Sequence, residues 1–253
     1  MEEEFSGKVV LVTGGSSGIG RAAAFAFAEQ GARVAVASRN EASGQATVDA
    51  IGSAGGEAVW IQCDVSMHDQ VQDLIGRIVR NYGHLDCAFN NAGSGGQGGW
   101  LAKIQEEDWD LKINGYLKSV WLCMKYEIPE ILKTGGGAIV NNSSVDGKRA
   151  FPWDPVYSAA KHGVLGLTKS AAMQYANQGL RINAVCPGWI RTPPVESTLQ
   201  AEPESEQQML MHQPIGRLGT PEEVAQAVLW LCSPSASFMV GCALDVDGGY
   251  LIV

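Results

Sequence analysis

Tyr157 and Lys161 are the two residues of this chain whose types and spacing most directly suggest acid/base chemistry. They stand four positions apart in a segment with a helical pattern, so the phenol and the ammonium can point into one pocket. The reference pKa of tyrosine is about 10, and proton transfer near neutral pH requires it to fall by about 3 units, or about 4 kcal/mol. A neighbouring cation can provide that stabilisation. Because this spacing also arises by chance in helices, the pair needs support from other motifs.

A glycine-rich stretch near the N-terminus has the residue types that bind a pyrophosphate. Residues 13–20 read TGGSSGIG, between an apolar run and an Ala-rich helical pattern. Glycines let the backbone turn sharply and approach a phosphate, and a helix N-terminus offers unpaired N–H groups with a partial positive charge. The spacing is G-x-x-x-G-x-G, which only approximates the G-x-G-x-x-G pattern of dinucleotide-binding turns. We predict a dinucleotide site here, with a plain glycine-rich turn as the alternative.

Ser38 and Arg39, at the end of the second apolar run, indicate which dinucleotide is bound. In dinucleotide-binding folds an acidic residue at this place binds the ribose 2′-hydroxyl of NAD, whereas an arginine accommodates the 2′-phosphate of NADP. A hydroxyl and a guanidinium can hydrogen-bond that phosphate with charge assistance. We therefore predict that NADP(H) is preferred over NAD(H). Ser17 in the glycine loop is not basic, so it adds no second positive contact, and a purely solvated Arg39 is the alternative.

The elements that must position these residues alternate along the chain between apolar runs and helical patterns. Strands whose two faces are both apolar are typical of a parallel sheet covered by helices on both sides. We predict an α/β fold, a single-domain Rossmann-type doubly wound sheet of seven parallel strands with helices on both faces. Its ligands bind beyond the carboxyl ends of the strands. The predicted strands are 8–13, 33–37, 58–62, 87–89, 138–142, 181–185 and 243–246, and the predicted helices are 19–30, 41–54, 67–82, 106–132, 157–176 and 221–232.

The predicted domain spans residues 1–253, with an acidic tail at 1–5. Residues 192–214 contain four prolines and break the alternation of strands and helices. Long irregular segments inside compact domains are usually lids or disordered, so we predict a substrate lid here.

Composition excludes several classes of function. The net charge of −9 argues against a nucleic-acid partner, which requires clustered Lys and Arg. Apolar runs stay below the roughly 20 residues that cross a bilayer, and the acidic N-terminus lacks the basic start of a signal peptide. Six scattered cysteines include no close pair, so no metal site is predicted. We expect a cytoplasmic protein that binds no membrane.

Further motifs follow the other predicted strands and complete a recognisable set. With TGGSSGIG and YSAAK, their order and spacing resemble the classical short-chain dehydrogenase/reductase (SDR) family over nearly the whole chain. Two features depart from that family's pattern: Asn142 stands where an apolar residue is usual, and residues 94–99 are unusually rich in glycine. The further motifs are Asp64-Val65, Asn90-Asn91-Ala92-Gly93, Asn114 in KINGY, Asn141 to Ser144, Pro187-Gly188 and the closing VDGGY of residues 246–250.

The resemblance implies a role for each residue of a catalytic group. Tyr157 would give a proton to the substrate oxygen in reduction and take one in oxidation, while Ser144 would hydrogen-bond that oxygen. Lys161 would bind the nicotinamide ribose and lower the pKa of Tyr157. Asn114 would lie at a break in its helix and hold a water linked to Lys161. Hydride transfer itself belongs to the cofactor.

The resemblance also implies the cofactor contacts and a homotetramer. The glycine loop would surround the pyrophosphate, Asp64 and Val65 would flank the adenine, and the segment after the sixth strand would face the nicotinamide. The helices carrying Tyr157 and residues 221–232 would form subunit contacts. The implied cofactor residues are Gly14, Ser16, Ser17, Gly18, Ile19, Gly20, Ser38, Arg39, Asp64, Val65, Asn91, Ala92, Gly93, Tyr157, Lys161, Pro187, Gly188, Ile190 and Thr192.

The substrate is predicted less closely than the reaction. A small ketone or secondary alcohol fits best, either cyclic, aromatic or sugar-like, and Trp100 and the lid would complete its pocket. One alternative is a 3-oxoacyl-[acyl-carrier-protein] reductase, for which Lys133 could meet an acidic carrier, although Gln178 stands where such reductases tend to have arginine. The other alternative is a non-catalytic NADP-binding sensor or scaffold. The predicted substrate residues are Val145, Asp146, Phe151, Trp153 and Trp189.

Overall fold

Seven parallel strands form one sheet in the order β3-β2-β1-β4-β5-β6-β7, which confirms the predicted doubly wound Rossmann-type fold. A computed structural model describes residues 4–93 and 96–253. Each observed strand end lies within two residues of its predicted position. The strands are β1 (Val9–Thr13), β2 (Arg33–Ser38), β3 (Glu57–Gln62), β4 (Cys87–Asn90), β5 (Gly137–Asn142), β6 (Leu180–Pro187) and β7 (Ala243–Val246).

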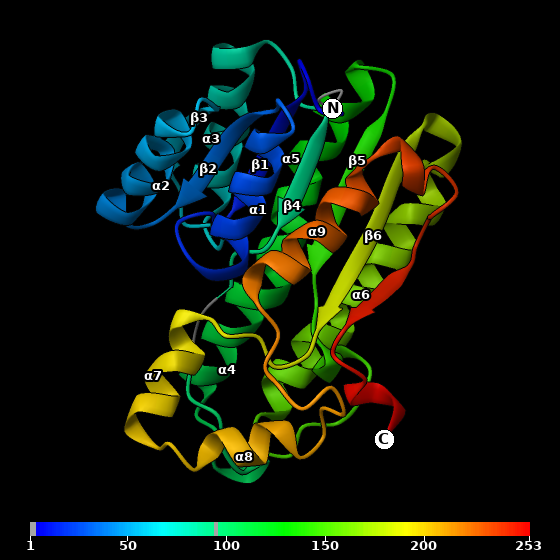
Figure 1. The fold of residues 1–253 in the computed structure, drawn as a ribbon. Helices are drawn as coiled ribbons and strands as arrows, with labels where there is room; N and C mark the ends of the chain where they lie inside the picture. The colour runs from blue at the N-terminus through cyan, green and yellow to red at the C-terminus, as the bar shows by residue number, and fades with distance from the viewer. Residues whose placement is uncertain (1–3, 94–95) are drawn as a thin grey trace.

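Helices cover both faces of the sheet and enclose a separate apolar core on each (Figure 1). Alternate residues of β1 pack into the two cores, because successive side chains of a strand point to opposite faces. Val10 and Val12 pack with α1, α2 and α9, whereas Val9 and Leu11 pack with α3, α5 and α6. These helices are α1 (Gly18–Glu29), α2 (Glu41–Ser53), α3 (His68–Tyr82), α5 (Ser119–Lys133), α6 (Pro155–Tyr175) and α9 (Pro221–Cys232).

The helix predicted over 106–132 is divided into three parts. An α-helix, α4 (Glu106–Lys112), is followed by the π-helical segment η2 (Ile113–Lys118) and then by α5. The N–H of Ser119 donates to the carbonyl of Asn114, five residues back, and the Ser119 hydroxyl donates to the carbonyl of Gly115 at 2.8 Å. Apolar periodicity does not reveal such a local change of hydrogen-bond pattern, which often marks a functional site.

The predicted lid contains two short helices, α7 (Pro193–Ala201) and α8 (Ser205–Leu210). Both lie beyond the carboxyl ends of the strands (Figure 1). Pro193 opens α7 at a position where its missing N–H costs nothing. An isolated β-bridge between Ile190 and Gly219 joins the two ends of the segment that contains both helices. The prolines and polar residues that break the longer pattern therefore separate short helices rather than prevent them.

The predicted tail and glycine-rich insert are described only in part. Residues 1–3, and with them most of the tail, lie outside the described residues, as do residues 94–95. Phe5 is buried, and its ring packs edge to face against Phe27 with 5.1 Å between centroids. Among the described residues, no helix is long and apolar enough to cross a bilayer. In the same residues, no group of three or more His, Cys, Asp or Glu could hold a metal ion.

A buried polar network connects α5 to the ends of β4 and β5. The amide of Asn90 donates to Glu127 and to the side chain of Asn141, each at 3.0 Å, and Asn141 donates to Thr168 on α6 at 2.9 Å. Glu127 is fully buried, and burial raises its pKa to about 8 despite the hydrogen bond from Asn90. The network therefore fixes β4 and β5 where their polar motifs begin, with Glu127 held as a neutral acid at neutral pH.

Replacing Glu127 by Gln tests this protonation state. The folded carboxyl keeps its proton up to about pH 8, whereas a glutamate in the unfolded chain loses its proton at about pH 4.3. Between these two pH values the unfolded state binds fewer protons than the folded state. The free energy of unfolding of the wild type therefore falls as pH rises. In urea titrations from about pH 5 to about pH 8, Glu127→Gln should show a shallower fall. The exposed Glu107→Gln is the matched control, and equal slopes for both variants and the wild type would contradict the assignment.

Candidate active site

A cavity of about 680 Å³ opens at the carboxyl ends of the strands and collects most of the predicted site residues. Arg39 follows β2, Asn91 follows β4, and Tyr157 and Lys161 come from α6. Of the predicted cofactor residues, Gly20, Pro187, Gly188 and Ile190 are not among those that line this cavity. The predicted residues that line it are Gly14, Ser16, Ser17, Gly18, Ile19, Ser38, Arg39, Asp64, Val65, Asn91, Ala92, Gly93, Asn114, Tyr157, Lys161 and Thr192.

The glycine loop has the geometry of an anion site. Helix α1 begins at Gly18, its N-cap Ser17 makes no side-chain cap, and its first turn contains no acidic residue. The N–H groups of that turn are therefore free of a competing side-chain acceptor, and the helix end carries a partial positive charge. Gly14 has a φ of +65°, and a Cβ there would lie 2.9 Å from the Cα of Ala92. This donor set fits the pyrophosphate of a dinucleotide.

Gly20 has a different structural role from the other glycines of the loop. A Cβ at this position would lie 2.2 Å from the carbonyl oxygen of Gly14. The absence of a side chain therefore allows α1 to pack against the turn that precedes it. Gly20 supports the shape of the loop from behind, which explains why it does not line the cavity.

Hydrogen bonds join the glycine loop to the segments after β4 and β5. The Thr13 hydroxyl accepts the N–H groups of Asn91 and Ala92, each at 3.0 Å. The amide of Asn142 donates to the side-chain oxygen of Asn91 at 2.9 Å. The side-chain oxygen of Asn142 is buried without a partner among the described residues, so it is an acceptor available to a ligand. The unusual Asn142 thus extends the polar wall of the cavity.

Tyr157 lies beside the Ser144 hydroxyl, and its environment resists ionisation. Burial raises the pKa of the phenol above its usual value, with a further rise from the neighbouring Tyr116, whereas hydrogen bonding by Ser144 lowers it. The Ser144 hydroxyl also accepts the N–H of Asp146 at 3.0 Å. Ser144 itself is not among the residues that line the cavity. The expected lowering of the Tyr157 pKa is not produced by this chain alone, because loss of hydration outweighs the favourable contacts.

Lys161 is almost completely buried and projects toward β5. Its ammonium donates to the backbone carbonyl of Asn142 at 2.7 Å. Burial lowers the pKa of Lys161 to about 8, although Cys186 and Asp146 act in the opposite direction. A single carbonyl is therefore its strongest contact, and the remaining ammonium protons are available to a ligand in the cavity.

Two residues that the sequence reasoning missed hold the start of α6. The Asp154 carboxylate accepts the N–H of Tyr157 at 3.1 Å and thereby caps the helix. The same carboxylate forms an ion pair with Lys112, whose side chain is 3% exposed. The N–H of Gly99 donates to the carbonyl of Trp153 at 2.9 Å, so the glycine-rich insert joins this corner. A charged pair more than forty positions apart along the chain gives no local sequence signal.

The two residues predicted to bind a 2′-phosphate differ in their freedom to do so. Ser38 is buried, its hydroxyl donates to the carbonyl of Asn40 at 3.2 Å, and it accepts the indole N–H of Trp60 at 3.0 Å. Its proton is therefore already used. Arg39 is exposed at the cavity, and among the described residues its guanidinium forms no ion pair. Arg39 is the group that remains available for a phosphate.

Three of the predicted substrate residues, together with Trp100, form two aromatic pairs outside the cavity. The rings of Phe151 and Trp189 lie 6.4 Å apart, and those of Trp100 and Trp153 lie 6.2 Å apart, both edge to face. Trp100 and Trp153 are largely exposed, at 69% and 64%. Val145, next to Ser144, is buried. Asp146 is partly buried, and burial raises its pKa to about 6.

Gln213, at the end of the predicted lid, was also missed and connects three segments. Its amide oxygen accepts the N–H of Trp189 at 3.0 Å, and its amide nitrogen donates to the carbonyl of Arg217 at 2.6 Å. A Cβ on Gly188 would lie 2.9 Å from Gln213. Gly188 is thus packed against the end of the predicted lid and against the C-terminal segment at Asp247.

Comparisons with known proteins agree with this arrangement. A family model described as "Enoyl-(Acyl carrier protein) reductase" matches residues 14–251. The chain is 43% identical to cyclohexanol dehydrogenase of Acinetobacter sp. (strain SE19), over 99% of this chain and 97% of the relative. It is 39% identical to 2,5-dichloro-2,5-cyclohexadiene-1,4-diol dehydrogenase of Sphingobium indicum (strain B90A), over 99% of each. A crystal structure of an actinorhodin polyketide ketoreductase variant with NADPH superposes with a TM-score of 0.92 at 36% identity, covering 96% of this chain and 97% of that one.

Removing the Asp154 carboxylate should destabilise the fold through the start of α6. Asp154→Ala leaves the buried Lys112 ammonium without its partner and removes the helix cap. Breaking a buried pair from one side typically costs about 3 kcal/mol. We expect the free energy of unfolding, measured in urea, to fall by about that amount. Asp73→Ala, which breaks the exposed pair with Arg80, should cost at most about 1 kcal/mol. A smaller loss for Asp154→Ala than for Asp73→Ala would contradict this role.

Proposed function

This chain belongs to the classical short-chain dehydrogenase/reductase family and is an oxidoreductase of CH–OH and C=O groups, and from this premise we propose that it interconverts a small cyclic ketone and its secondary alcohol with NADP(H). The observation that carries the proposal is that one cavity brings the glycine loop and Arg39 together with Asn114, Tyr157 and Lys161. A dinucleotide-binding end and a proton-relay end are what this reaction requires.

In the proposed reduction, each polar group of the chain has a separate task. When bound, a nicotinamide cofactor would supply the hydride for the carbonyl carbon. The Tyr157 phenol gives its proton to the carbonyl oxygen, and the Ser144 hydroxyl hydrogen-bonds the same oxygen. Lys161, held by the Asn142 carbonyl, directs its remaining protons toward the cofactor ribose and stabilises the phenolate left behind. Asn114 holds a water through which the proton is replaced. Oxidation runs through the same groups in reverse.

A cyclic substrate is supported by the aromatic side chains of the predicted pocket and by the relatives. Phe151 and Trp189 form an edge-to-face aromatic pair that suits a ring-bearing compound. The two relatives described above are dehydrogenases whose names specify a cyclohexanol and a cyclohexadiene diol. Val145, Asp146 and Trp153, together with α7 and α8 of the lid, complete the proposed pocket.

A carrier-protein substrate is less well supported by the described residues. Lys133 ends α5 before the start of β5, at the amino ends of the strands and opposite the cavity, and its ammonium pairs with Glu130 at 2.7 Å. The carrier alternative expected Lys133 to border the site, but within one chain Lys133 lies away from it. The purely sensory alternative does not apply to an oxidoreductase of this family.

We also propose a cytoplasmic homotetramer. Large apolar side chains on α6, α9 and the connection to β7 are exposed in the single chain, which is unusual unless another surface covers them. Met173 on α6 is 85% exposed, Trp230 on α9 is 40% exposed and Phe238 is 99% exposed. These are the helices that the resemblance assigns to subunit contacts.

Tyr157→Phe tests the assignment of the proton donor. Loss of the phenolic proton should lower kcat for NADPH-dependent reduction of cyclohexanone or a related cyclic ketone by at least about a hundredfold. The dissociation constant for NADPH, followed by its fluorescence, should change by less than about threefold, since the ring is retained. Tyr175→Phe, at the far end of α6, is the matched control. Unchanged turnover in Tyr157→Phe would remove the basis of the proposed mechanism.

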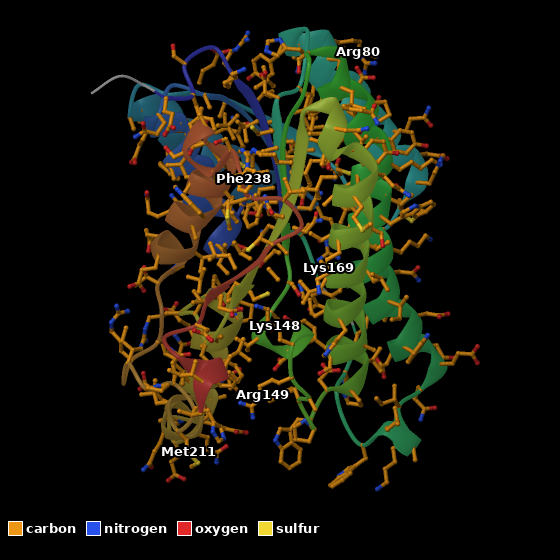
Figure 2. The ribbon with its side chains drawn as sticks, turned by 90° about the vertical axis from the view of Figure 1, so that its right-hand side faces the viewer. Arg80, Lys148, Arg149, Lys169, Met211 and Phe238 are labelled. Carbon is orange, nitrogen blue, oxygen red and sulfur yellow. The ribbon has the colours of Figure 1, made fainter. Side chains whose placement is uncertain are left out.

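Arg39→Ala tests the cofactor preference. A hydrogen bond to a charged group contributes about 1.5 to 3 kcal/mol, so losing it should weaken NADPH binding about tenfold or more. NADH lacks the 2′-phosphate, and its affinity should change little. Arg80→Ala is the control, since Arg80 lies far from the lid at the opposite end of the molecule from Met211 (Figure 2). An equal effect of Arg39→Ala on both cofactors would show that Arg39 does not select NADP(H).

A further inference from the structure

Tyr116 is an aromatic residue of the cavity that the catalytic roles described above do not include. It lies in the π-helical segment η2, two residues after Asn114, and it lines the cavity with Tyr157 and Lys161. Burial raises the pKa of its phenol, so the side chain stays neutral under ordinary conditions. The altered hydrogen bonding of η2 changes the direction of side chains relative to a regular helix. Its position is therefore a product of the same local feature that places Asn114.

The Tyr116 ring packs directly on the ring of Tyr157. Their centroids are 5.0 Å apart and their planes meet at 87°, which is the preferred edge-to-face geometry of an aromatic pair. The position of a tyrosine hydroxyl is set mainly by χ1, which has only a few staggered states, so a ring packed against one side restricts where the hydroxyl lies. The hydroxyl of Tyr157 is the atom that must be aligned with the substrate oxygen.

Gly93 provides the space that the Tyr116 ring requires. A Cβ at position 93 would lie 2.5 Å from Cδ1 and 2.6 Å from Cε1 of Tyr116. The glycine that ends the Asn-Asn-Ala-Gly motif thus contacts the Cδ1–Cε1 side of this ring, and Tyr116 is held between the segment after β4 and helix α6. A ring enclosed in this way acts as a fixed support rather than as a mobile surface side chain.

The same ring also contributes to the surroundings of Lys161. The Lys161 ammonium lies 5.1 Å from the centroid of Tyr116 and 5.5 Å from that of Tyr157. Among the described residues, Lys161 forms no ion pair with a carboxylate. Two aromatic faces and the Asn142 carbonyl therefore provide the favourable electrostatic contacts of this buried cation.

We propose that Tyr116 is a positioning residue, whose ring fixes the Tyr157 hydroxyl and the Lys161 ammonium relative to each other for proton transfer. The proposal rests on the proposed function, because it assigns proton transfer to Tyr157. It requires the ring of Tyr116 and not its hydroxyl. Tyr116 gives no proton and accepts none; it acts through the alignment of the two neighbouring groups.

The ring requirement is tested by comparing Tyr116→Leu with Tyr116→Phe. In Tyr116→Leu, kcat for NADPH-dependent reduction of the cyclic ketone should fall about tenfold, which corresponds to about 1.4 kcal/mol in barrier height. The KM for the ketone and the dissociation constant for NADPH should change by less than about threefold, because misalignment affects the transition state more than binding. Tyr116→Phe keeps the ring and should remain within about threefold of the wild type in all these quantities.

A second readout does not depend on turnover. In protein carrying isotope-labelled tyrosine, the NMR signal of the Tyr157 ring is identified as the one missing from Tyr157→Phe. This signal should be shifted by the ring current of Tyr116 in the wild type and in Tyr116→Phe, and should move and broaden in Tyr116→Leu. Thermal unfolding of each variant shows whether a loss of activity merely follows a loss of stability.

The outcomes separate this proposal from the proposed function. If Tyr157→Phe is inactive while Tyr116→Leu keeps full kcat and an unchanged Tyr157 signal, the positioning role is wrong and the function stands. If Tyr116→Phe loses as much activity as Tyr116→Leu, the hydroxyl is required and the positioning role is again wrong. If Tyr157→Phe turns over normally, the proposed function fails. In that case the NMR signal still tests the positioning role, which would be wrong if the Tyr157 signal were unchanged in Tyr116→Leu.

Discussion

The contact between the Lys161 ammonium and the Asn142 carbonyl is the interaction on which the arrangement of the cavity depends. It joins α6 to the end of β5 across 2.7 Å, at a point where the cation is buried and has lost most of its hydration. Since a buried charge is costly without partners, its few contacts are constrained in position. Tyr157, one helical turn earlier, is placed by the same constraint. The polar ends of β4 and β5 must therefore be fixed before α6 can present its side chains correctly.

The structure supplies that fixed framework in two layers. Below the cavity, Glu127, Asn90 and Asn141 bind one another within the core and reach Thr168 of α6. At the floor of the cavity, Thr13 and Asn91 join the glycine loop to the segment after β4. Hydrogen-bonded networks of this kind restrict the positions that polar side chains can adopt. The predicted cofactor end is thus cross-linked by hydrogen bonds, whereas the aromatic pairs on the predicted substrate side join separate segments by ring packing.

The fold was predictable because its signals are local or repetitive. Apolar runs of β2 and β6 on both faces specify a parallel sheet, and TGGSSGIG specifies a turn before a helix. Most site residues were predictable because order and spacing resemble one family. Three features were not predictable, since each joins residues through tertiary packing: the ion pair of Lys112 with Asp154, the edge-to-face contact of Tyr116 with Tyr157 and the hydrogen bonds of Gln213. The pKa of Tyr157 was expected to fall, but in the chain alone burial dominates and raises it.

The bridge between Ile190 and Gly219 has a consequence for how this protein can diversify. It brings the two ends of the segment containing α7 and α8 together, so that this segment forms a loop closed at its base. The entropy cost of closing such a loop rises only slowly with its length. We expect that insertions and deletions within α7 and α8, between Thr192 and Gln213, can therefore alter which compounds are accepted while the reaction chemistry is inherited unchanged.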